Sequence, residues 1–201
     1  MEPLTRRYFE APTLEVAEDL IGHFLVNESG GQRLVGRIVE TEAYREDDPA
    51  CHAWSSVRAR GGRVPENWRG HVLRGEPGLA YIYLNYGMYW LLNVVTEPPG
   101  IGAAVLIRAV EPVEGIDIMR LRRAVSDDRE LTNGPGKLTV AFGIDSSYHK
   151  HPLTESPLYL ARAPRKERLR VEVSRRIGIT KGADLPWRYY LSGSKFVSRA
   201  G

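Results

Sequence analysis

The chain has 201 residues, 42% of them hydrophobic and 26% charged, which is enough for one substantial core and ordinary for a globular protein. Its single cysteine, Cys51, excludes an internal disulfide framework and a cysteine-rich zinc site. The first residues contain no long apolar run, and no later run is long enough to span a bilayer. We therefore expect a soluble, intracellular, cytoplasmic protein that is neither secreted nor membrane-bound.

The net charge is only +3, but the basic residues are unevenly distributed along the chain. Residues 162–201 contain 11 Lys and Arg against 3 Asp and Glu. A second basic group lies in a loop-like stretch, at Arg58, Arg60, Arg63, Arg69 and Arg74. Basic surface of this kind attracts phosphate backbones, although a solvated basic face without a partner explains the charge alone equally well.

In chain order, the first predicted elements are a helix from Thr13 to Ile21, a short strand at 24–26 and a longer strand from about Arg33 to Thr41. If the longer strand stays regular, its apolar side is continued by two carboxylates and a phenol, at Glu40, Glu42 and Tyr44. Burying such groups is costly unless they are used or partnered. The strand is therefore a candidate part of a functional site.

A β-hairpin is predicted from Ala80 to Val95, after a long polar stretch from residue 45 to residue 78. Two aromatic and β-branched runs flank a tight turn at residues 85–88, where Asn and Gly tolerate positive φ. Tyr81 and Tyr89 are expected to bury as ordinary sheet aromatics. Tyr86 stands at the tip of the turn, where a phenol suits a wedge between stacked bases better than a core.

A central strand is predicted from Ala103 to Val110, and its one charge, Arg108, needs an acidic or phosphate partner. Arg108 either forms a purely structural ion pair or pairs with Glu40 or Glu42 as part of a site. A helix is predicted from Pro112 to about Val125, with an apolar side that comprises Ile116, Ile118, Met119 and Leu121.

The glycine-rich residues 133–137 open a second predicted helix, Lys137 to Phe142, whose start is suited to phosphate binding but is not a P-loop. Strands are predicted at 158–160 and 169–173, the latter alternating Leu169, Val171 and Val173 with charged residues. A strand, a turn and a second strand are predicted at residues 186–199. Since no repeat or linker divides the sequence, we expect a single domain over residues 1–201.

Several motifs occur together and in one order: Glu40-Thr41-Glu42-Ala43-Tyr44 followed by His52, Tyr83-x-x-Tyr86-Gly87-Met88-Tyr89 with Asn93, Leu106-Ile107-Arg108-Ala109, and Asn133-Gly134-Pro135. Together they resemble the alkyladenine (3-methyladenine) DNA glycosylase family, over a stretch from about Leu20 to the carboxy-terminal GSKFVS. The resemblance implies an α+β fold, a single domain with a curved, mainly antiparallel sheet flanked by helices and a protruding hairpin that inserts into DNA.

The resemblance also implies a monofunctional, monomeric enzyme of base-excision repair that needs no metal or cofactor. Such an enzyme flips alkylated or deaminated purines, such as 3-methyladenine or hypoxanthine, out of double-stranded DNA and leaves an abasic site. In a bacterium it would be associated with the nucleoid. Departures from the family pattern are Val72-Leu73, the stretch 54–68 and a longer turn at 98–102.

Roles follow from the resemblance residue by residue. Glu42 looks like the general base that activates water, a choice that strand alternation alone leaves open between Glu40 and Glu42, and Arg108 resembles the residue that holds Glu42 and the water. The base pocket is implied to comprise Tyr44 and His52 as walls, Tyr83 stacked on the opposite side of the base, and Asn93 against the exocyclic amine of guanine. The DNA contacts of the hairpin are implied to be Tyr86 as the intercalating wedge, with Met88 and Tyr89.

Three other hypotheses come from the residues themselves. A nucleic-acid-binding module without chemistry would use the aromatic hairpin but leave Glu42 and Arg108 without a role. A hydrolase with Cys51 and His52 is disfavoured, because adjacent residues of an extended chain point apart. A metal site with His52, His71, Asp47 and Asp48 fits no zinc spacing. Of the other histidines, His149 and His151 are expected in a solvent loop, and His23 is expected to be structural.

Overall fold

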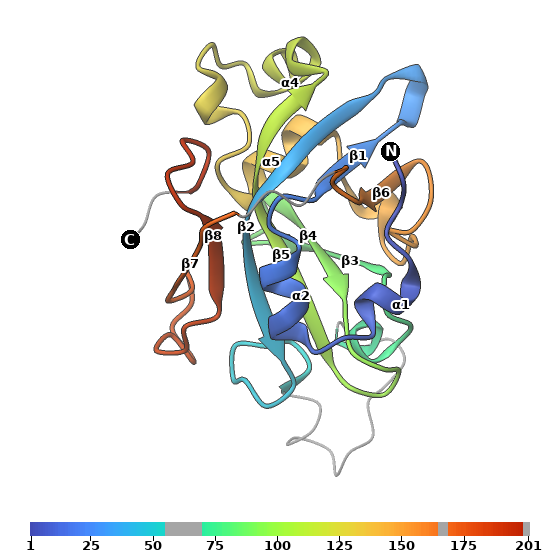
Figure 1. Ribbon diagram of the computed structural model, residues 1–201, viewed down its shortest axis with the longest axis vertical. Helices are drawn as coiled ribbons and strands as arrows, with labels where there is room; N and C mark the ends of the chain where they lie inside the picture. The colour runs from blue at the N-terminus through green and yellow to red at the C-terminus, as the bar shows by residue number, and fades with distance from the viewer. Residues whose placement is uncertain (55–69, 165–168, 199–201) are drawn as a thin grey trace.

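Two long antiparallel strands, β2 (Leu34–Arg45) and β5 (Ala103–Glu114), form the centre of the fold in the computed structural model (Figure 1). The structure describes residues 1–54, 70–164 and 169–198. Within these residues, eight strands form one curled sheet in the order β3-β4-β5-β2-β1-β6, while β8 pairs with β2 and β7 pairs with β8. The other strands are β1 (Phe24–Asn27), β3 (Ala80–Asn85), β4 (Tyr89–Val95), β6 (Leu158–Ala161), β7 (Val171–Ser174) and β8 (Arg188–Leu191).

Strand β2 is longer and less regular than the sequence predicts. It runs on to Arg45 instead of ending at Thr41, and its pairing with β5 shifts register three times, between Val35 and Glu40 and again at Thr41. These irregularities increase the local twist of the strand, so the regular alternation expected from Leu34 to Tyr44 is wrong. One edge of β2 pairs with β1 as far as Arg37 and with β8 from Glu40 onward, because the sheet curls there.

Four α-helices are described: α1 (Arg6–Phe9), α2 (Thr13–Asp19), α4 (Ile116–Arg123) and α5 (Pro135–Phe142). Helix α2 packs against β2 and β5, and α5 packs against β4 and β5. Short 3-10 turns lie at Ser29–Gly31, His71–Arg74, Asp128–Glu130 and Ser146–Tyr148. No helix among the described residues has the length and apolar character needed to cross a membrane.

The helix predicted from Pro112 is wrong at its start. Strand β5 continues to Glu114 and Pro112 pairs with Gly36 beside a register shift, where a missing N–H is tolerated. The left-handed backbone of Gly115 then separates the strand from α4. Leu121, predicted on the apolar side of the helix, is 82% exposed, while Met119 is buried.

The carboxy-terminal residues lie at the side of the sheet, against β2 (Figure 1). Only one of the two strands predicted for residues 186–199 forms, β8, because the chain after it turns inward and Ser198 donates its N–H to the buried carboxylate of Glu40. The alternation predicted for 169–173 is also wrong in part, since Val173 is exposed.

The main core lies between the sheet and helices α2 and α5, and includes Val16, Ile38, Val94, Ile107 and Phe142. A second, smaller cluster of buried side chains comprises Cys51, Ala53, Val72, Leu73, Tyr81, Val95 and Ala104. Tyr44 and Tyr83 pack against this second cluster and are partly accessible. The second cluster therefore supports one wall of the pocket described below.

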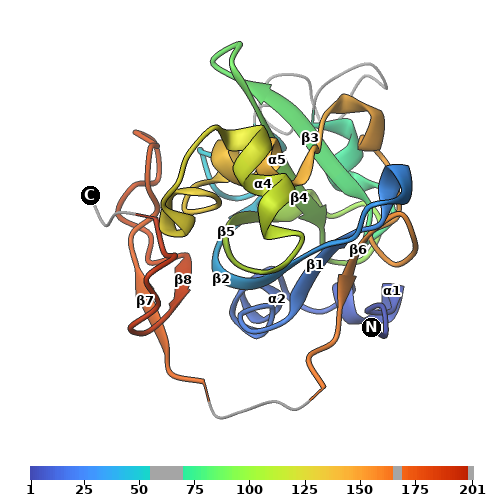
Figure 2. The ribbon, with the colours of Figure 1, turned by 90° about the horizontal axis from the view of Figure 1, so that it is seen from above.

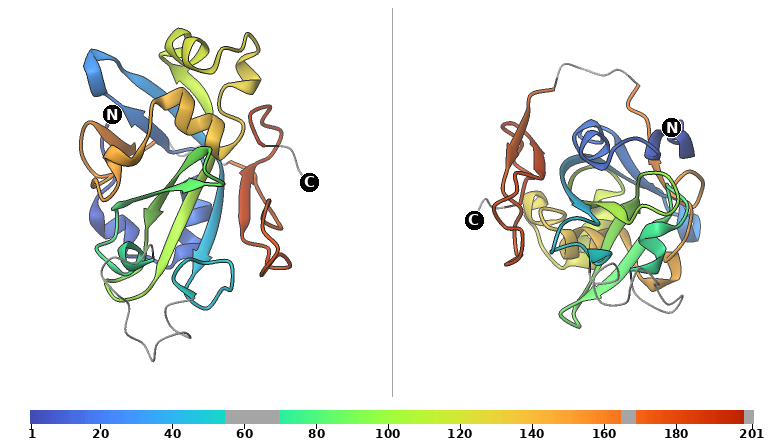
Figure 3. Two further views of the ribbon diagram at one scale, coloured as in Figure 1. Left: turned by 180° about the vertical axis from the view of Figure 1, so that it is seen from behind. Right: turned by 90° about the horizontal axis from the view of Figure 1, so that it is seen from below.

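The β3–β4 hairpin is formed as predicted and projects from the rest of the described chain (Figures 2 and 3). Asn85 accepts a hydrogen bond from the Met88 N–H across the turn, and both Tyr86 and Gly87 have positive φ. A tight turn of this kind places the Tyr86 side chain at the extreme end of the hairpin.

Candidate active site

Two buried carboxylates and one arginine meet where β2 and β5 pair. The Arg108 guanidinium donates from Nε to Glu40 at 3.0 Å and lies 3.1 Å from Glu42 through Nη1. Both carboxylates have no exposed surface, and Arg108 is nearly buried. The sequence left Glu40 and Glu42 open as partners of Arg108, and the structure shows that it binds both.

Among the described residues, Glu42 has two hydrogen-bond donors and one ion-pair partner. Its Oε2 accepts from the Tyr44 hydroxyl at 2.8 Å and pairs with Arg108, and its Oε1 accepts from the Ile177 N–H at 2.7 Å. A set of donors without an acceptor matches an ionised carboxylate, which only accepts. Burial, and then the charge and hydrogen bond of Glu42, raise the pKa of Tyr44 well above its usual value, so this phenol stays protonated as a donor.

Glu40 has a different set of partners. It is bound by Arg108, by Arg188 at 2.6 Å and by both the N–H and the hydroxyl of Ser198, each at 2.7 Å. These partners hold the carboxy-terminal segment onto β2. The two carboxylates thus differ in surroundings, since the partners of Glu40 tie elements together while the partners of Glu42 face a cavity.

That cavity, the pocket, has a volume of about 420 Å³ and lies between the β3–β4 hairpin, the end of β2 and residues 177–179. The three polar partners of Glu42 all line it: Tyr44, Arg108 and Ile177. The predicted pocket residues His52, Tyr83 and Asn93 also line it, together with Leu73 and Tyr86. One pocket therefore gathers most of the site residues expected from the family resemblance.

Aromatic rings form the wall of the pocket nearest the hairpin. The rings of His52 and Tyr83 meet edge to face at 4.7 Å, and the Tyr81 and Tyr83 rings are stacked at 5.4 Å. His52 Nδ1 lies 2.7 Å from the Tyr81 hydroxyl, and the Asn93 amide donates to the Tyr81 carbonyl at 3.0 Å. These contacts hold His52 and Asn93 in defined orientations at the pocket surface.

The three hairpin residues expected to contact DNA are all accessible. Tyr86 is 81% exposed, Met88 68% and Tyr89 45%. The prediction that Tyr81 buries is confirmed, but the same prediction for Tyr89 is wrong, because Tyr89 begins β4 beyond the cover of the core. Tyr86 lines the mouth of the pocket and extends into solvent, so a single side chain joins the pocket to the outer surface.

Five partners of the site were not predicted from sequence: Asp48, Arg176, Ile177, Arg188 and Ser198. Arg176 and Arg188 belong to the basic carboxy-terminal stretch that the sequence assigned to the surface, yet both are buried and paired with carboxylates. Arg188 follows Trp187 and precedes two tyrosines in a short strand, the same signal of a charge within an apolar run that singled out Arg108. Arg74 pairs with Glu46, and Arg58, Arg60, Arg63 and Arg69 lie outside the described residues.

The alternative sites can be judged from the same geometry. Burial raises the pKa of the Cys51 thiol to about 12, so it is not a thiolate nucleophile at neutral pH. No group of three or more potential metal ligands comes together among the described residues. His23 is buried and structural, as predicted, and its Nδ1 accepts from Ala163. His149 and His151 are not free in solvent, since their rings bond the backbone of Ile82 and Leu158.

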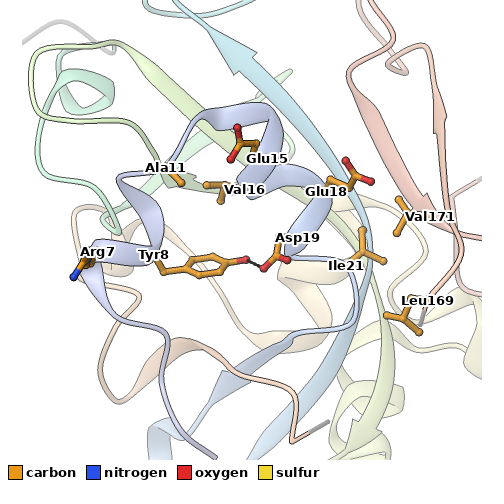
Figure 4. Close-up of a pocket in the computed structure, with 10 residues that line it drawn as sticks. All are labelled: Arg7, Tyr8, Ala11, Glu15, Val16, Glu18, Asp19, Ile21, Leu169 and Val171. Atoms are coloured by element: carbon orange, nitrogen blue, oxygen red, sulfur yellow. Dashed lines mark hydrogen bonds between the residues drawn. The ribbon is translucent and has the colours of Figure 1, made fainter. Parts of the chain in front are cut away.

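A larger cavity of about 680 Å³ lies elsewhere, between helices α1 and α2 and residues 169–171 (Figure 4). Its lining mixes apolar side chains with three acids and one arginine, and the Tyr8 hydroxyl donates to Asp19 at 2.8 Å. None of its lining residues belongs to the Glu42 and Arg108 cluster. The smaller pocket is therefore the candidate active site, because the buried charges lie directly behind it.

Comparison with known proteins places this arrangement in the class of DNA glycosylases, the enzymes that begin base-excision repair of DNA. A family model described as methylpurine-DNA glycosylase (MPG) matches residues 7–195. The chain belongs to the methylpurine-DNA glycosylase family, which confirms the resemblance found in the motifs.

Three bacterial relatives match this chain over nearly all of their own length, and each carries the name putative 3-methyladenine DNA glycosylase. The relative from Salinibacter ruber is 54% identical over 202 residues, which cover 100% of this chain and 98% of the relative. The relative from Carboxydothermus hydrogenoformans is 45% identical, with 98% of each chain covered. The relative from Bradyrhizobium diazoefficiens is 46% identical and covers 98% of this chain and 92% of its own length.

Proposed function

We propose that this protein removes alkylated or deaminated purines, among them 3-methyladenine and hypoxanthine, from double-stranded DNA by hydrolysis of the N-glycosidic bond. The observation that carries the proposal is the Glu42 carboxylate, buried directly behind an aromatic pocket and bound by donors that line that pocket. A carboxylate placed in this way can take a proton from a water that enters the pocket.

Base flipping brings the damaged purine to the pocket. The pocket volume of about 420 Å³ falls within the range of small-molecule sites, roughly 300–1,000 Å³. Tyr86, exposed at the tip of the hairpin, enters the base stack as a wedge and fills the gap that the flipped nucleotide leaves. Met88 and Tyr89 flank Tyr86 and contact the DNA beside it. Flipping costs a few kcal/mol and is cheapest for damaged or mismatched pairs, so it contributes to selection.

In the reaction, the bond between the base and C1′ of the sugar breaks toward an oxocarbenium-like sugar. The negative charge of Glu42 stabilises that cation, and the same carboxylate takes the proton of the attacking water as its oxygen bonds to C1′. Arg108 holds Glu42 in place. Tyr44, His52 and Tyr83 contact the base, and a ring made cationic by alkylation gains from aromatic contacts, on the order of 1 kcal/mol each. Asn93 opposes the exocyclic amine of guanine.

Alkylation at N3 or N7 of the purine gives a cationic base that leaves without further protonation, whereas a neutral base such as hypoxanthine must acquire a proton. Within the described residues, the recorded partners of Glu42 include no lysine amine. The proposal is therefore a hydrolysis that ends at the abasic site, without a Schiff-base step that would cut the strand.

The test uses an end-labelled duplex with one hypoxanthine, incubated with wild type and with Glu42→Gln and then treated with alkali. We expect strand breaks only after alkali and only with wild type. Release of 3-methyladenine from alkylated DNA, measured in parallel, separates a pocket that rejects hypoxanthine from a protein without activity. Glu15→Gln, the same substitution at an exposed position of α2, is the matched control and should cleave as wild type does.

Full excision by Glu42→Gln would remove Glu42 from the mechanism. Absence of excision on both substrates, with DNA binding intact, would instead favour a non-catalytic nucleic-acid-binding module.

A further inference from the structure

Arg176 occupies a buried position behind the pocket, next to the wall that faces Glu42. Its guanidinium forms a double ion pair with the Asp48 carboxylate, and neither side chain has exposed surface. It also donates to the Ala43 carbonyl at 2.9 Å and to the Gly182 carbonyl at 3.0 Å. Arg176 therefore ties together three segments of the chain: the end of β2, the turn after it, and residues 176–182.

Two further connections lead from Arg176 to Glu42. Ile177, the next residue in the chain, donates its N–H to Glu42 Oε1 at 2.7 Å. The Arg176 guanidinium also lies over the ring of Tyr44, 4.6 Å from its centroid, and the Tyr44 hydroxyl donates to Glu42 Oε2. Both oxygens of Glu42 are thus bound by groups whose positions depend on Arg176.

Asp48 holds the Arg176 guanidinium in place. Its Oδ1 also accepts the Ala50 N–H at 2.9 Å, which closes the turn that leads from β2 to Cys51 and His52. Burial alone would lower the pKa of Arg176, but the hydrogen bond and charge of Asp48 raise it, so the arginine keeps its charge. The space around the pair is filled, because a Cβ on Gly182 would come within 2.6 Å of Asp48 Oδ1.

We propose that Arg176, held by Asp48, is a positioning residue for the excision reaction: it aims the Ile177 N–H and the Tyr44 hydroxyl at the two oxygens of Glu42. This inference rests on the proposed function, in which Glu42 is the general base. Arg176 itself lies outside the pocket lining. Without it, Glu42 loses defined donors on both oxygens.

The test compares four variants by single-turnover excision over a range of pH, with the Kd for an abasic-site duplex measured separately. Arg176→Met removes the guanidinium, and Arg176→Lys keeps the charge but not the paired hydrogen bonds. Gly182→Ala retains every charge, but its Cβ crowds Asp48 Oδ1 and strains the left-handed backbone of residue 182. Arg123→Met is the matched control, because Arg123 is a partly buried arginine of α4 that donates to the carbonyls of Glu130 and Leu131.

We expect Arg176→Met to lower the single-turnover rate by roughly 100-fold, the size of effect that follows from a displacement of about 1 Å in a catalytic group. The acid limb of its pH–rate profile should move to higher pH, because both oxygens of Glu42 then lack fixed donors. Arg176→Lys and Gly182→Ala should show the same shift with a smaller loss of rate, while the Kd stays near that of wild type. Arg123→Met should keep both the rate and the profile.

A purely structural role for Arg176 predicts lower melting temperatures and an unmoved pH profile at temperatures where the variants are folded, and that result would overturn the inference. If Glu42→Gln is inactive while Arg176→Met and Gly182→Ala excise at the wild-type rate, only this inference fails. If Glu42→Gln excises at the wild-type rate, the proposed function fails first. Glu42→Gln is assayed beside the four variants, so these outcomes are distinguishable within one series.

Discussion

Replacing Glu40 by glutamine distinguishes the roles of the two acids of β2, Glu40 and Glu42. Glu40 accepts four hydrogen bonds, from Arg108, Arg188 and twice from Ser198, and has no exposed surface. In Glu40→Gln the side chain keeps its volume but loses its charge, and its amide N–H₂ faces donors. Arg108 still pairs with Glu42, whereas the buried Arg188 loses the carboxylate that it binds at 2.6 Å.

An uncompensated buried charge of this kind costs roughly 3–5 kcal/mol. For a chain of this length, about 2–4 °C of melting temperature corresponds to each kcal/mol, so the melting temperature of Glu40→Gln should fall by roughly 6–20 °C. Glu42→Gln should fall less, because Arg108 retains Glu40 and the remaining partners are a phenol and an N–H, and its loss should be about 1–3 kcal/mol.

Thermal unfolding followed by circular dichroism measures both variants against wild type. At a temperature where all three are folded, Glu40→Gln should still excise damaged bases, while Glu42→Gln should not. Glu15→Gln controls for the loss of an acid at the surface. A melting temperature of Glu40→Gln equal to that of wild type would refute the reasoning, as would a larger loss of stability in Glu42→Gln.

Three further predictions concern other parts of the molecule. Tyr86→Ala should lower base flipping and excision without changing stability, since Tyr86 is 81% exposed; unchanged excision by this variant would rule out the wedge. Burial, and then the charge of Arg162, lower the pKa of His23 to about 4 from an ordinary value of 6.5, so the unfolded chain binds the extra proton between these values. The free energy of unfolding should therefore decrease by up to about 3 kcal/mol as the pH falls through this window, and His23→Gln should flatten that dependence in urea titrations across pH. Duplex binding should weaken steeply with salt. Lys181→Ala and Lys195→Ala, at exposed positions, should each reduce the slope of log K against log salt by about 0.9 where the lysine contacts a phosphate. Equal slopes for wild type and variants would remove these lysines from the DNA footprint.

Local patterns were sufficient for the parts of the fold that depend on near neighbours. The β3–β4 hairpin follows from two β-branched and aromatic runs around Asn85 and Gly87, and the structure forms it with the expected turn. Arg108 stood out as one charge in an apolar run, which required an acidic or phosphate partner, and it binds the two acids that were considered. Helices α2 and α5 likewise form close to their predicted bounds.

Alternation along β2 failed where the strand meets several neighbours at once. Period-2 reasoning assumes an even ladder, but three register shifts against β5 change which side chains face inward. Local reasoning also failed at Pro112. Its sequence context suggested the start of a helix, but its pairing with Gly36 keeps it in a strand. In both cases a partner strand distant in the sequence decides the local structure.

The sequence by itself determined the family, the need of Arg108 for a partner, and the aromatic hairpin, because these depend on motifs and on short-range periodicity. Only the tertiary structure decided which basic residues are buried. Arg176 meets Asp48 across 128 positions, and Arg188 meets Glu40 across 148. A charge enters a protein interior only where folding delivers its counter-charge, and composition cannot reveal that meeting, so arginines that looked like DNA-binding surface instead lie behind the candidate active site.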